Sequence, residues 1–149
     1  MITPLIMLAL MAVPWLAVRT RAAGAFGLGI LFLFTGVGHF LETQAMAQML
    51  PGFVPARVPL VYLTGILEFA IAAGFFFPAT RRLAGWSAAV VLVLFFPANI
   101  YAAFAQVPMG GHAWGPVYLL VRAPLQAAIV LWVWWFVLRQ PEARVKLHA

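Results

Sequence analysis

Cysteine is absent from this chain, and acidic residues are scarce. The 149 residues include no cysteine and only three Asp or Glu. Without thiols the chain has no means to form a disulfide, a thiol redox relay, an iron–sulfur cluster or a thiolate metal site. Any redox chemistry would therefore belong to a bound cofactor or to a partner.

Charge is low overall and apolar residues dominate. Charged residues make up 8% of the chain and hydrophobic residues 66%, whereas soluble domains carry about 25% charged residues. The net charge of +6 comes from basic residues at the ends of apolar runs, without the basic stripe that nucleic-acid binding needs. We therefore expect one integral membrane domain over residues 1–149, with membrane lipids and no nucleic acid among its partners.

Five apolar runs approach the length of about 20 residues that a helix needs to cross a bilayer. We expect helices at residues 3–18, 22–40, 59–77, 83–103 and 117–138, and a short interfacial helix within 42–50. No basic residue precedes the first run, so we interpret it as a retained helix and not a signal peptide. The predicted fold is all-α: a four-helix transmembrane bundle over 22–138, an extra N-terminal transmembrane helix within 1–21, and a cytoplasmic tail at 139–149.

The basic residues predict the orientation of this five-helix path. Arg57 and Arg122 fall on one side of it. The other seven basic residues fall on the opposite side: Arg19, Arg21, Arg81, Arg82, Arg139, Arg144 and Lys146. Because cytoplasmic loops carry an excess of Lys and Arg, we expect the N-terminus outside and the C-terminus inside.

Glu68 is the residue that most needs an explanation. A charge near the centre of a membrane helix costs at least about 2.5 kcal/mol. Arg122 and Gln126 lie four residues apart on one face of another predicted helix, and Gln126 lies at the same depth as Glu68. We expect an outward-opening polar pocket formed by five ligand-binding candidates: His39, Glu68, Asn99, Arg122 and Gln126.

Each candidate also has a purely structural interpretation. Glu68 and Arg122 would neutralise each other as a buried ion pair that fixes helix register. His39 would be a hydrogen-bonded interfacial histidine, and Asn99 would help repair the helix where Pro97 removes a backbone donor.

Metal and catalytic chemistry have little support in the sequence. His39 and Glu42 alone do not make a metal site, and His112 is expected on a solvated loop. We therefore predict no metal site and assign no catalytic residue.

Several ordered segments resemble the DoxX-like family of small bacterial membrane proteins. The segments are GVGHF at 36–40, MLP at 49–51, YLTGILE at 62–68, RRLAG at 81–85, FPAN at 96–99 and RAPLQ at 122–126. The resemblance implies a four-helix bundle in the bacterial cytoplasmic (inner) membrane. It also implies a link to quinone or terminal-oxidase systems, thiosulfate oxidation or membrane redox complexes. The extra N-terminal helix departs from that pattern.

On this basis we expect an accessory or binding protein linked to a membrane redox system, with a quinone or an isoprenoid lipid as the candidate ligand. Two alternatives stay open. One is a purely structural subunit of a larger membrane oxidoreductase complex, with redox subunits as partners. The other is a small transporter or a membrane enzyme.

Overall fold

The computed structural model describes residues 2–139, and every regular element within them is helical. The predicted all-α fold is therefore confirmed, while nearly all of the predicted tail at 139–149 lies outside the described residues. The elements are α1 (Ile2–Val18), α2 (Arg21–Leu41), α3 (Thr43–Gln48), α4 (Arg57–Phe76), α5 (Arg81–Phe104), the 3-10 helix η1 (His112–Tyr118), α6 (Leu119–Val133) and the π-helical turn η2 (Trp134–Leu138).

Four stretches are long and apolar enough to cross a membrane: α2, α4, α5 and His112–Leu138. Their outer faces carry large apolar side chains such as Leu63, Val93 and Leu131, each about two-thirds exposed. The chain therefore has the architecture of a multi-pass membrane protein. α1 is apolar but has 17 residues, fewer than the ~20 that a crossing needs, so a fifth crossing stays a prediction.

The helix boundaries follow the sequence signals closely. Thr20 caps α2, and its hydroxyl accepts a hydrogen bond from the Ala23 amide at 3.2 Å. The interfacial helix predicted within 42–50 is α3. The single helix predicted at 117–138 is observed as the end of η1 followed by α6 and η2. Within η1, Gly115 has φ 75° and ψ −160°, which are not helical. The regular α-helix begins only at Leu119.

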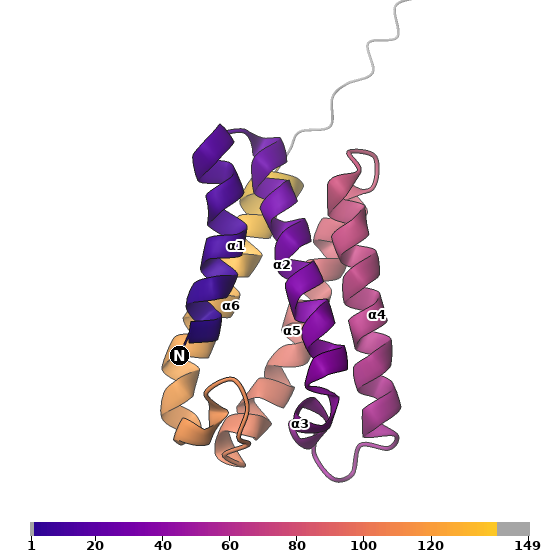
Figure 1. Ribbon diagram of the computed structural model, residues 1–149, viewed down its shortest axis with the longest axis vertical. Coiled ribbons are helices and arrows are strands. Elements are labelled where there is room, and N and C mark those ends of the chain that lie inside the picture. Colours follow the sequence, from indigo (N-terminus) through magenta and orange to yellow (C-terminus); the bar gives the residue numbers. More distant parts are fainter. Residues whose placement is uncertain (1, 140–149) are drawn as a thin grey trace, which may run out of the picture.

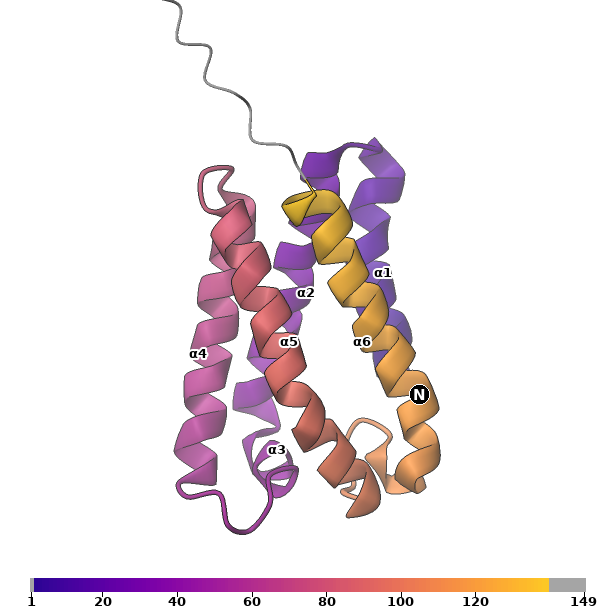
Figure 2. The same ribbon diagram turned by 180° about the vertical axis from the view of Figure 1, so that it is seen from behind.

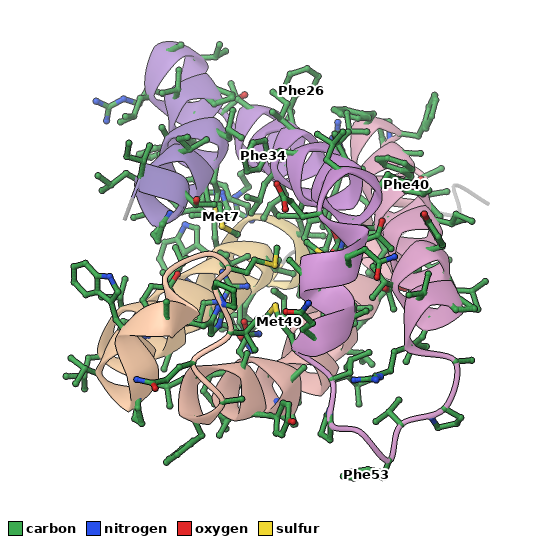
Figure 3. All side chains as sticks on the ribbon, turned by 60° about the horizontal axis from the view of Figure 1, so that its bottom comes forward. Met7, Phe26, Phe34, Phe40, Met49 and Phe53 are labelled. Atoms are coloured by element: carbon green, nitrogen blue, oxygen red, sulfur yellow. The ribbon has the colours of Figure 1, made fainter. Side chains whose placement is uncertain are left out.

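Five of the helices form a closed ring in the order α1, α2, α4, α5, α6, and each packs against its two neighbours (Figures 1 and 2). The α2–α4 contact is the most extensive. α3 lies across one end of the ring and contacts α2 and α4. In Figure 3, which brings this end forward, Met49 points into the bundle while Phe53 lies at the tip of the following loop.

The two ends of the bundle differ in charge, and we call them the α3 end and the basic end. The basic end holds the α1–α2 turn, the α4–α5 turn and η2 (Figure 1). Its described arginines are Arg19, Arg21, Arg81, Arg82 and Arg139. Arg19 lies 5.2 Å from the Trp15 ring, and Arg139 lies 4.4 Å from the Trp135 ring, distances at which a cation is attracted to an aromatic face. Residues 144 and 146, predicted for the same side, lie outside the described residues.

The hydrophobic core fills the half of the bundle nearer the basic end. Its largest fully buried side chains are Leu28, Leu31, Phe75 and Val133. Trp132 packs at the edge of this core and donates its indole N–H to the Gly24 carbonyl at 3.2 Å. Dense apolar packing in this half leaves buried polar groups only toward the α3 end.

Candidate functional site

The buried polar side chains of the described residues all lie in the half of the bundle nearer the α3 end. They are His39, Thr43, Glu68, Asn99 and His112. Arg122 and Gln126, on α6, are half-buried in the same half. We use the name polar cluster for His39, Glu68, Asn99, His112 and Arg122. The one-sided distribution predicted from the sequence is therefore present in the structure.

His39 is the direct neighbour of Glu68. Its Nδ1 lies 3.6 Å from Glu68 Oε2 and 3.0 Å from the Thr35 carbonyl. Reciprocal glycines bring the two helices together: a Cβ on Gly65 would lie 2.7 Å from His39 Cβ, and one on Gly36 would lie 3.5 Å from Glu68 Cβ. Small residues allow this close backbone approach in membrane bundles.

Arg122 makes its contacts elsewhere. Its Nε donates to Asn99 Oδ1 at 3.0 Å, and its Nη1 lies 3.9 Å from the Met7 sulfur. Asn99 is held in turn because its Nδ2 donates to the Phe95 carbonyl at 2.9 Å. The predicted direct ion pair between Glu68 and Arg122 is therefore not formed among the described residues. Matching the depths of two residues does not determine which way each side chain points around its helix.

Arg122 nevertheless connects the parts of the cluster electrostatically. Its positive charge interacts with Glu68 and with His112. Tyr118, one turn earlier on the same face, is also close enough to interact. Met7 of α1 lies beside this group and points into the bundle (Figure 3). Side chains of four other elements, α1, α4, α5 and η1, therefore surround Arg122.

Gln126 ties two helices together. Its Nε2 donates a hydrogen bond to the Leu92 carbonyl on α5. Leu92 precedes Val93, whose carbonyl loses its helical partner at Pro97. Gln126 and Asn99 thus both bind α5 backbone next to this proline. Repair of the α5 backbone next to Pro97 therefore explains the hydrogen bond from Gln126 to Leu92 and the one from Asn99 to Phe95. It does not explain the hydrogen bond that Asn99 accepts from Arg122.

His112 is a site residue whose environment the sequence did not predict. We expected a solvated loop, but the side chain is only 3% exposed. Its Nδ1 lies 2.8 Å from the Met109 carbonyl, and its ring meets Tyr118 edge to face at 4.9 Å. Gly111 (φ 106°) lies against the same Tyr118 ring and turns the chain inward. Gly111 allows this burial because a side chain at that position would collide with the Tyr118 ring.

Two buried polar atoms of the described side chains have no hydrogen-bond partner, Glu68 Oε2 and His112 Nε2. Both belong to the polar cluster. An unsatisfied buried group costs about 1–3 kcal/mol, and a charged one costs more. The cluster thus has unused hydrogen-bonding capacity on two different elements, α4 and η1.

Two surface hollows lie at the α3 end, apart from the polar cluster. The larger has a volume of about 480 Å³ and is lined by residues such as Gln44, Gln48 and Arg57. The smaller, of about 260 Å³, is lined by residues such as Phe40, Glu42 and Tyr62. Neither includes a residue of the polar cluster, so neither is the pocket predicted from the sequence. No group of three or more potential metal ligands occurs within residues 2–139.

No curated protein and no solved structure matches this chain. The resemblance to DoxX-like proteins stays a prediction. One family model matches residues 28–137 and is described as "Domain of unknown function (DUF8561)". The matched region contains all five residues of the polar cluster and excludes α1. Because the match covers most of the 149 residues, the chain belongs to this DUF8561 family.

Proposed function

We propose that the protein is an integral membrane binding protein that holds the polar head of a small amphipathic molecule at the polar cluster. The observation that carries this proposal is the pair of unsatisfied atoms, Glu68 Oε2 and His112 Nε2. Their side chains are 5% and 3% exposed, so neither is freely open to solvent or to lipid.

Leaving these two atoms without partners costs free energy. In the hydrocarbon region no bulk water satisfies polar groups, and each unsatisfied one costs several kcal/mol. Ionisable residues in membrane helices are therefore functional-site candidates by default. Arg122 uses Nε for Asn99 and places Nη1 against a weak sulfur acceptor. The guanidinium thus has further N–H groups for an occupant of the same space.

A membrane-dissolved ligand fits these surroundings. Its apolar tail would lie among the lipid-facing side chains, and its head would exchange hydrogen bonds with the cluster. Quinones and isoprenoid lipids are the candidate ligands, and a link to membrane redox chemistry follows from the DoxX-like resemblance. The absence of cysteine means that such a protein would bind the redox molecule without thiol chemistry of its own.

The charge distribution supports an orientation for this binding protein. Five described arginines lie at the basic end, and the positive-inside rule would direct that end to the cytoplasm. The α3 end and the polar cluster would then face outward. We place the protein in a bacterial cytoplasmic membrane with five crossings, of which α1 would be the shortest.

Analysis of retained lipids tests the proposal. The full chain is purified from membranes in mild detergent, and its bound molecules are identified by native mass spectrometry and by lipid extraction. We expect one small amphiphile retained well above its share of the membrane lipids. Glu68→Gln should reduce its occupancy several-fold, and Glu42→Gln, at an exposed glutamate, should not.

A wild-type protein that retains only bulk lipids would overturn the proposal. The alternative of a structural subunit predicts another result in the same experiment. Redox subunits would then co-purify with wild type and Glu68→Gln alike, with no enriched small molecule.

A further inference from the structure

The two histidines of the polar cluster are oriented in the same way. His39 Nδ1 lies 3.0 Å from the Thr35 carbonyl, and His112 Nδ1 lies 2.8 Å from the Met109 carbonyl. A carbonyl oxygen only accepts hydrogen bonds, so each Nδ1 must carry the proton. In a neutral imidazole the other nitrogen, Nε2, is then the acceptor.

The neutral ring is the relevant form of His112. Arg122 already brings a positive charge that interacts with this histidine, and a second cation beside it would be repelled. His112 Nε2 is therefore an unpartnered lone pair on a buried ring. The hydrogen bond to Met109 determines that Nε2, and not Nδ1, is the acceptor of this buried ring.

Glu68 presents the same kind of group. When it is ionised, the Glu68 carboxylate only accepts hydrogen bonds, and its Oε2 has no hydrogen-bond partner. The N–H of His39 Nδ1 is 3.6 Å away and is directed to Thr35. With Glu68 ionised, both unsatisfied atoms of the described side chains are acceptors, on α4 and on η1.

We propose that the polar cluster selects a ligand by its uncharged hydroxyl groups, so that the occupant is a quinol or an isoprenoid alcohol and not a quinone. This inference rests on the proposed function and specifies its ligand. A quinone carbonyl offers only lone pairs and would leave both acceptors unsatisfied. A hydroxyl donates to an acceptor and can also accept from an Arg122 N–H.

Charged heads fit the cluster less well. An ammonium group would be attracted by an ionised Glu68 but repelled by Arg122. A phosphate or carboxylate would be attracted by Arg122 but repelled by Glu68, and it offers no proton to the lone pair of His112. Sites that bind a donor by hydrogen bonding reject analogues that lack it, because the buried groups of the site stay unpaired.

Matched probes test the selection directly. Binding to the full-length wild-type protein in detergent is measured calorimetrically under reducing, oxygen-free conditions for a benzoquinol with a decyl chain and for its dimethyl ether. The corresponding quinone is measured without the reductant. A second pair, farnesol and its methyl ether, distinguishes an isoprenoid alcohol from a phenolic ligand. We expect at least one hydroxyl probe to bind about tenfold or more tightly than its ether, the effect of one well-placed hydrogen bond.

A variant then tests whether His112 is the acceptor that selects the hydroxyl group. His112→Leu removes the Nε2 acceptor and should bring the hydroxyl and ether affinities to within about threefold of each other. Glu42→Gln should keep the wild-type ratio. The wild-type probe series needs no variant, so the test does not depend on His112→Leu folding.

The outcomes separate the two proposals. Equal binding of hydroxyl, ether and quinone probes overturns hydroxyl selection but leaves an amphiphile-binding protein. Tighter binding of the quinone than of the quinol also overturns it. Failure of every probe to bind, together with no retained amphiphile in the purified protein, overturns the proposed function itself.

Discussion

At the scale of single residues, the neighbours of Glu68 are determined by how closely the surrounding helices approach. Arg122, one turn from the depth-matched Gln126 on the same helix face, was the expected partner, but His39 is nearer because glycines let α2 and α4 approach closely. Arg122 binds the neutral amide of Asn99. Glu68 and Arg122 therefore interact without forming a direct ion pair.

The Arg122–Asn99 hydrogen bond yields a stability prediction. Asn99→Leu removes the acceptor of a partly buried cation, and hydrogen bonds to charged groups contribute about 1.5–3 kcal/mol. We expect the free energy of unfolding, measured in detergent, to fall by about 2 kcal/mol. Gln44→Leu, at an exposed amide on α3, should change it little. Equal effects of the two substitutions would contradict a structural role for the Asn99 contact.

The five candidate residues could be predicted because polar side chains are rare in apolar helices. His39, Glu68, Asn99 and Arg122 do share one polar cluster, while Gln126 binds the α5 backbone. His112 was placed wrongly because its burial depends on the contact with Tyr118. That packing lies between a loop and a helix, where no periodic pattern reports it.

At the scale of elements, α1 is held to the bundle through glycine. A Cβ on Gly27 would collide with the Met11 backbone carbonyl of α1. α1 also lies outside the region shared with the family, yet it brings Met7 to Arg122. It therefore contributes to the wall of the polar cluster from outside the matched region.

Gly27→Ala should separate α1 from α2. The obstacle is backbone, which cannot rotate away, so we expect a loss of about 1–3 kcal/mol, typical of overpacking. Thermal unfolding in detergent measures it, and Gly52→Ala is the matched control because no atom lies near a Cβ there. An unchanged transition in Gly27→Ala would show that the helices separate without cost.

Helix positions were largely predictable, because Pro, Gly and Arg interrupt the apolar runs where the helices end. The details of the last helix were not. Its start depends on the backbone conformation of Gly115, and it ends in the π-helical turn η2. Neither feature changes the hydrophobic pattern from which the helix was predicted.

At the scale of the whole molecule, the interiors of the two halves of the bundle differ in polarity. Toward the basic end the interior is apolar and closely packed, and toward the α3 end it holds the polar cluster. Arginine and tryptophan pairs mark the basic end. This difference in polarity between the two ends predicts a single orientation of the molecule in the membrane.

Cysteine labelling checks that direction without interference, since the chain has no native thiol. Gly52→Cys and Ala79→Cys put single thiols at exposed positions on the α3 end and the basic end. In intact cells we expect a membrane-impermeant maleimide to label Gly52→Cys only. Ala79→Cys should react after permeabilisation. The reverse pattern would contradict the orientation proposed from the arginines.

The packed apolar half has a consequence for proton movement. A proton that reaches Glu68 from the α3 end meets Leu28, Leu31, Phe75 and Val133 beyond it, all fully buried and without polar atoms in their side chains. These four side chains offer no hydrogen-bonding atom that could carry a proton toward the basic end. We therefore expect Glu68 to exchange protons with the α3 end and not with the basic end. A titrating molecule bound at the polar cluster would then exchange its protons on the same side.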